Sequence, residues 1–176
     1  MGGTDLMVPS SRIKIPEADY ALVTFVRSSV MAFGVKVMIW DTETLVGELT
    51  PRKIIQYKAE PGTHLFLAKS GHWSYLTAHL SAGKHYVVTL NATPGGYTAS
   101  IELTPALPYE DKVSKTDVDG WLFGIEVQKP MSEYAEVYKV PYLSEVREAI
   151  KKYNDKRVDA LTLNAGDYWP HISLEP

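Results

Sequence analysis

Four histidines lie close together in the middle of the chain, and imidazole rings can bind zinc or copper. His64, His72, His79 and His85 fall on different predicted strands and turns, without the HxH or HxxxH spacing that metal sites often show. We therefore predict independent surface or edge histidines and no metal site.

Other candidate motifs are fragments. Asp117–Gly120 carries the alternating Asp and the Gly of a calcium-binding loop but lacks its third oxygen ligand and its final Glu, so a polar turn is predicted. Gly95-Gly96 precedes a strand rather than a helix, which argues against a phosphate site. The GxSxG and HExxH motifs are absent. We predict no catalytic residue, no cofactor and a protein that is not an enzyme.

The aromatic residues support two interpretations of their role. They could line a platform for a carbohydrate or a peptide, or they could fill the core and attach the C-terminal tail. Trp73 and Tyr75 are the candidates for ligand binding. The other aromatic residues considered are Trp121, Tyr134, Tyr138, Tyr142 and Trp169.

Composition limits the function classes. Of the 176 residues, 45% are hydrophobic and 22% charged, which is typical of a globular protein. A net charge of -3 argues against a general nucleic-acid binder, which needs a basic face. The absence of Cys excludes disulfides and thiolate ligands. The longest apolar run, around Val37–Trp40, is much shorter than the roughly 20 residues of a membrane helix.

Alternating hydrophobicity predicts about eight strands, because only a half-buried strand needs a period of two. The predicted strands are Ala21–Ser29, Val35–Trp40, Leu45–Leu49, Lys53–Ala59, Thr63–Ala68, Trp73–Leu80, His85–Ala92 and Tyr97–Leu103. Parity places one set of side chains toward the core: Val23, Phe25, Val35, Val37, Ile39, Leu65, Leu67, Leu76, Leu80, Tyr86, Val88, Leu90, Ile101 and Leu103.

Short turns separate these strands, at Asp41–Thr44, Pro61-Gly62, Ser81–Lys84 and Pro94–Gly96. Such short connections join antiparallel neighbours, since parallel strands need a long crossover. The predicted fold is an all-β antiparallel β-sandwich of about eight strands.

Three regions follow: an extended leader or linker (1–19), the sandwich (20–107) and a C-terminal extension (108–176). The extension contains a predicted strand, Trp121–Val127, and one helix, Ser144–Arg157, capped by Ser144. The helix has an apolar stripe that must pack on a surface, and we predict that the surface is the protein's own sandwich. The stripe also supplies the candidates for partner docking, Val146, Ile150 and Tyr153.

Residues 20–107 resemble the bacterial family called domain of unknown function 2846. The resemblance rests on a strand ending in R-x-S, a strand ending in D and followed by G-x-L, a P-G-x-H strand and an L-x-A-G-K-x-Y-x-V strand. The matching residues are Arg27, Asp41, Gly47, Pro61, Gly62, His64, Ala82, Gly83, Lys84 and Tyr86. The resemblance implies a small β-sandwich, often found behind a lipoprotein signal in Gram-negative envelopes, and it implies no catalytic residue.

This chain lacks the family's signal peptide and acceptor Cys. The expected location is periplasmic or outer-membrane-associated in a Gram-negative bacterium if Met1-Gly2-Gly3 replaces a removed leader, and otherwise cytoplasmic. The expected function is a non-enzymatic, envelope-associated binding or assembly module. The alternative is a small-ligand or carbohydrate-binding sandwich that uses an aromatic face. A protein partner or envelope component is expected, but neither nucleic acid nor a membrane-spanning segment.

Overall fold

The computed structural model describes residues 6–93 and 100–170. These residues form eleven strands and two helices. The strands are β1 (Met7–Pro9), β2 (Ala21–Arg27), β3 (Val37–Asp41), β4 (Thr44–Leu49), β5 (Lys53–Ala59), β6 (Gly62–Lys69), β7 (Trp73–Leu80), β8 (His85–Thr93), β9 (Ser100–Ala106), β10 (Glu126–Pro130) and β11 (Leu161–Leu163). The helices are α1 (Lys115–Gly124) and α2 (Ser132–Asn154).

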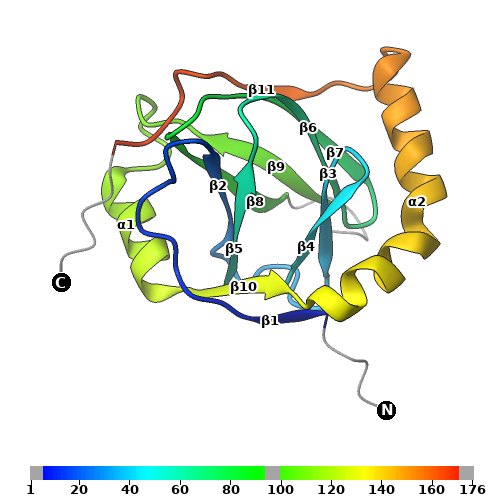
Figure 1. The fold of residues 1–176 in the computed structure, drawn as a ribbon, viewed down its shortest axis with the longest axis horizontal. Coiled ribbons are helices and arrows are strands. Elements are labelled where there is room, and N and C mark those ends of the chain that lie inside the picture. Colours follow the sequence, from blue (N-terminus) through cyan, green and yellow to red (C-terminus); the bar gives the residue numbers. More distant parts are fainter. Residues whose placement is uncertain (1–5, 94–99, 171–176) are drawn as a thin grey trace.

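The strands form a two-sheet sandwich with a helix outside each sheet (Figure 1). The first sheet has the order β1-β10-β5-β2-β8-β9 and the second the order β11-β7-β6-β3-β4. Helix α1 packs on the outer face of the first sheet through Val118 and Leu122. Helix α2 packs on the outer face of the second sheet through Val146 and Ala149. The prediction of a β-sandwich carrying a packed C-terminal helix is confirmed.

Both faces of the central strands are buried because sheet and helix cover opposite sides. Every residue of β2 is buried, with Val23 and Phe25 facing the other sheet and Val26 packed in the layer beneath α1. The parity prediction was wrong in β6. Phe66 lies in the central core, whereas Leu67 packs beneath α2. Where apolar residues occupy both odd and even positions of a strand, the sequence does not show which set faces the other sheet.

The sheets are mixed, so the purely antiparallel prediction was wrong. Strand β2 pairs in parallel with β8, β5 with β10 and β7 with β11. The count of about eight strands was also too low, because the flanking regions contribute strands. Met7–Pro9 of the predicted leader forms β1 against β10, and the extension supplies β10 and β11. Residues 20–107 alone complete neither sheet.

The extension differs most from the prediction. The predicted strand Trp121–Val127 is divided between α1 and β10, and Asp117–Gly120 lies within α1 rather than in a turn. The signal for α1 is a capping box, in which the Ser114 hydroxyl accepts from the amide of Asp117 and the Asp117 carboxylate accepts from the amide of Ser114.

Helix α2 begins at Ser132 rather than Ser144 and ends at Asn154 rather than Arg157. Its N-cap, Met131, makes no side-chain capping bond, and Pro141 lies inside the helix. A helix usually ends before an interior proline, so the sequence pattern concealed the first half of α2.

Two predicted turns contain glycines with positive φ, but these turns link strands of different sheets, β5 to β6 and β7 to β8. The prediction that these short connections join antiparallel neighbours was therefore wrong there. Gly62 has φ +133° and Gly83 has φ +71°, and the backbone of a residue with a side chain would be strained at these angles. The predicted turn Pro94–Gly96 and the start of the predicted strand Tyr97–Leu103 lie outside the described residues. Within the described part of the chain, neither helix is long and apolar enough to cross a membrane.

Candidate docking loop and ligand hollow

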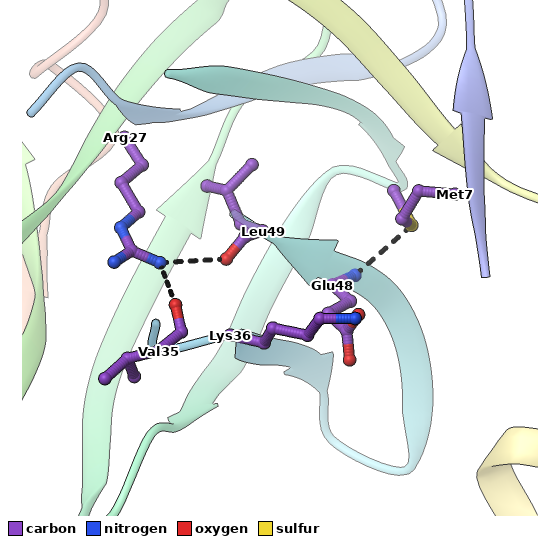
Figure 2. A network of polar contacts seen from close by, with 6 residues as sticks. All are labelled: Met7, Arg27, Val35, Lys36, Glu48 and Leu49. Carbon is purple, nitrogen blue, oxygen red and sulfur yellow. Dashed lines mark hydrogen bonds and ion pairs between the residues drawn. The ribbon is translucent and has the colours of Figure 1, made fainter. Parts of the chain in front are cut away.

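Arg27, at the end of β2, is a buried cation that binds backbone carbonyls. Only 1% of the surface of this residue is exposed to solvent. The guanidinium donates to the carbonyl oxygens of Val35 at 2.5 Å, Ala32 at 2.9 Å, Leu49 at 3.2 Å and Met31 at 3.3 Å. Figure 2 shows the bonds to Val35 and Leu49. Three of the four acceptors belong to residues 28–36, which we call the anchored loop.

The anchored loop is held by the buried Arg27 side chain and by hydrogen bonds within the loop. Burial lowers the pKa of Arg27, and in the described residues no carboxylate pairs with it. The carbonyl dipoles therefore offset the cost of desolvating its charge. Two local bonds add rigidity, from the Val35 amide to the Ala32 carbonyl at 2.9 Å and from the Met31 amide to the Ser29 hydroxyl at 3.0 Å.

The backbone of the anchored loop divides its apolar side chains between core and solvent. Ala32 and Val35 pack against the central core. Phe33 is 82% exposed, Val30 58% and Met31 54%. Three large apolar side chains thus stand in water on one short segment of fixed conformation. Exposed apolar residues that gather in this way mark contact sites in proteins.

The strands beside the anchored loop are tied to the N-terminal segment. Lys36 pairs with Glu48 at 3.4 Å, and the Glu48 amide lies 3.3 Å from the Met7 sulfur (Figure 2). The edge strand β1 thereby supports the hairpin of β3 and β4.

The predicted ligand residues lie together in a hollow. Trp73 and Tyr75, two positions apart on β7, line a space of about 280 Å³ with the exposed carboxylates of Glu102 and Asp159. Trp73 is half-buried, whereas Tyr75 is buried and stacks on Tyr153, with the ring centroids 6.2 Å apart.

The structure also unites these residues with the predicted docking stripe. Val146, Ile150 and Tyr153 of α2 pack in the same apolar cluster as Trp73 and Tyr75. The Tyr153 hydroxyl lies 2.8 Å from that of Thr77 on β7. Ion pairs from Lys69 to Glu145 and from Arg147 to Glu43 hold the helix down on either side. The stripe therefore covers the chain's own second sheet.

Two of the four histidines are not independent surface or edge groups. His64 Nδ1 lies 2.8 Å from the Asp41 carboxylate, which also accepts from the Tyr57 hydroxyl at 2.8 Å. His85 is buried, and its Nε2 lies 2.6 Å from the Thr24 hydroxyl. Sequence distance concealed these partners, since each bond joins different strands. Among residues 6–93 and 100–170, no three His, Asp or Glu side chains gather to hold a metal.

Sequence reasoning missed the anchored loop because the predicted strands reached Ser29 and resumed at Val35. The strands in fact end at Arg27 and resume at Val37. The available signal was Arg27 itself, a charged residue directly after six apolar or β-branched ones. Such a residue is buried only where acceptors surround it.

A scan against protein-family models finds no match to this chain, and no curated protein matches it. The resemblance to domain of unknown function 2846 therefore stays a prediction.

Proposed function

We propose that this protein is a non-enzymatic binding or assembly module of the bacterial envelope that docks a protein partner through the anchored loop. The exposed Phe33, on a loop fixed by the buried Arg27, is the observation that carries the proposal. The envelope location rests on the family resemblance.

The fixed conformation of the loop favours a role in docking. A buried arginine that satisfies four carbonyls holds Phe33 and Met31 outward in one arrangement. An interface residue that is already ordered loses less conformational entropy when it binds. Aromatic residues, including Phe, and Met are also enriched at protein interfaces relative to the rest of the surface.

The charges nearby favour a protein over a lipid surface. The one cation of the anchored loop, Lys36, is paired with Glu48. The whole chain carries a net charge of -3, which opposes its approach to anionic lipid. An apolar pocket on a protein partner needs neither a basic patch nor a positive net charge.

Photo-crosslinking tests the proposal. Benzoylphenylalanine is placed at position 33, and at position 123 as a control, in cells that express the native protein. Phe123 suits this purpose because it is 63% exposed but lies on α1. We expect a crosslinked protein of discrete mass from position 33 alone, and its loss when Met31→Ser is added.

Three outcomes would overturn the proposal. The first is the absence of a protein adduct at position 33, and the second is the same adduct from both positions. The third is sedimentation of the protein with vesicles of phosphatidylglycerol and phosphatidylethanolamine that Phe33→Ser abolishes, which would make the anchored loop a lipid contact.

A second candidate function is small-ligand or carbohydrate binding at the hollow beside Trp73. It is favoured by the two aromatic residues and two carboxylates that line one space. A glycan and metabolite screen by thermal shift tests it, because a ligand at about 100 times its dissociation constant adds roughly 2.7 kcal/mol. A stabilising ligand must lose its effect in Trp73→Ala.

A further inference from the structure

We propose that a second hollow, at the end of β2 opposite the anchored loop, binds a small carboxylate built on a single ring. Its volume is about 250 Å³, and its lining includes Pro16, Lys84, His85, Tyr168, Trp169 and Pro170. It forms where Leu22, near the start of β2, pairs with His85. Arg27 and the anchored loop lie at the other end of the same strand.

The walls of this carboxylate hollow are held by backbone bonds. The Trp169 amide donates to the His85 carbonyl at 2.8 Å, and the Trp169 indole donates to the Ala106 carbonyl at 2.9 Å. On the other side, the Gly83 amide donates to the Tyr20 carbonyl at 2.9 Å. Ligand sites are usually already formed in the free protein, and these hydrogen bonds fix the walls of the hollow in the same way.

Lys84 supplies a cation that has no acidic partner among the described residues. Its Nζ lies 4.3 Å from the centre of the Tyr168 ring, and no carboxylate in the described residues pairs with it. Lys58 offers a contrast within the same protein. Its Nζ lies 4.8 Å from the Tyr20 ring, but it also pairs with Glu17 at 2.8 Å. The charge of Lys84 is therefore available to an anion.

His85 supplies a second donor. Burial lowers its pKa to about 4, so the ring is neutral at pH 7. The Thr24 oxygen accepts from the Gln56 amide at 3.4 Å and lies 2.6 Å from His85 Nε2, and we assign the Thr24 hydroxyl as the donor to Nε2. A neutral ring that accepts at Nε2 carries its proton on Nδ1. Nδ1 has no hydrogen-bond partner within residues 6–93 and 100–170.

These groups define the ligand by its chemistry. An ammonium and an imidazole N–H both donate, which suits a carboxylate. The half-exposed Tyr168 ring and two prolines offer flat apolar contacts to the rest of the ligand. A space of about 250 Å³ lies below the roughly 300–1,000 Å³ of sites for drug-sized molecules, so one ring is the upper limit.

Titration followed by amide NMR tests the proposal with two pairs of probes. Benzoate is compared with neutral benzamide, and glucuronate with neutral glucose. We expect saturable shifts at Gly83–His85 and Tyr168–Trp169 for at least one carboxylate, with binding weakened roughly tenfold in its neutral partner. Lys84→Met should weaken binding of that carboxylate by a similar factor, whereas Lys58→Met should leave it unchanged.

The proposal is overturned if neither carboxylate produces saturable shifts at these amides. It is also overturned if Lys84→Met, with an otherwise unchanged amide spectrum, binds as the parent does, or if the neutral probes bind equally well. None of these results bears on the anchored loop, because that loop follows the far end of β2.

Discussion

His64 Nδ1 lies 2.8 Å from Asp41 Oδ2, and this contact joins the end of β3 to β6. The other ring nitrogen, Nε2, lies 2.7 Å from the carbonyl of Glu60. A carbonyl and an ionised carboxylate can only accept, so these contacts favour the imidazolium, in which both nitrogens donate. The pair thus closes the β3–β4 hairpin against the turn that precedes β6.

The Asp41–His64 pair predicts lower stability at alkaline pH. The hydrogen bond to Asp41 is the main cause that raises the pKa of His64 above its ordinary value of 6.5. The contribution of the pair is therefore complete below pH 6.5 and is lost as the pH rises through the folded-state pKa. Urea unfolding at pH 6 and pH 8.5 should show this loss in the free energy of unfolding.

Asp41→Asn provides the matched variant. It should lower the free energy of unfolding at pH 6 by about 2 kcal/mol, because it weakens hydrogen bonds to a charged group. It should also flatten the alkaline slope and lower the pKa of His64 measured by NMR. His72→Gln changes an exposed histidine and should retain the slope. An unchanged slope in Asp41→Asn would rule out the ion pair as its source.

His85 predicts the opposite pH dependence. Because burial lowers its folded-state pKa to about 4, the unfolded chain binds a proton more readily between pH 6.5 and pH 4. Stability should fall as the pH falls through that window, by roughly 3 kcal/mol from this group alone. The difference between the parent and His85→Gln, measured by urea unfolding at pH 7 and pH 4.5, isolates the contribution. A pH-independent difference would contradict it.

Arg27→Met should be strongly destabilising. It leaves the carbonyls of Met31, Ala32, Val35 and Leu49 without their donor, and we expect a loss of about 3–5 kcal/mol in urea unfolding. Arg27→Lys should also destabilise, since an ammonium cannot span four acceptors as a guanidinium does. Hydrogen exchange at the Val35 amide should quicken in both variants. Arg52→Met, an exposed control, should match the parent.

The apolar face of α2 should be essential for stability. Val146→Asp with Ile150→Asp introduces charges beneath the helix, so the free energy of unfolding should fall by several kcal/mol. Val140→Asp is the control, because Val140 is 67% exposed on the same helix and should change little. If the double variant keeps its melting temperature but changes its mass in light scattering, the stripe docks another chain instead.

Local patterning predicted the presence of strands β2 to β9 and the turns that precede β4, β6 and β8. The exact bounds of Lys53–Ala59 and Trp73–Leu80 follow from the turn formers that flank them, and the positive φ of Gly83 follows from the tight turn that links β7 to β8. These features depend on neighbours within a few residues, which is why the sequence alone predicts them.

Tertiary structure decided which strands pair in parallel, which face of β6 meets the core, and where α2 begins. Leu65 and Leu67 alternate as strand residues should. Because α2 packs on the outer face of the second sheet, these side chains pack beneath the helix and not in the central core. The start of α2 has no side-chain cap and contains Pro141, so the helix there depends on contacts such as that of Tyr138 with the central core.

The candidate sites also required the folded chain. Arg27 meets carbonyls up to 22 residues away, and Lys84 meets Tyr168, which lies 84 residues further along the chain. A residue type in one segment does not specify which distant backbone or ring will face it. Burying a cation without a partner costs free energy, so the folded chain must supply compensating contacts. These contacts form only when the sheets assemble, because the cation is desolvated in the same step.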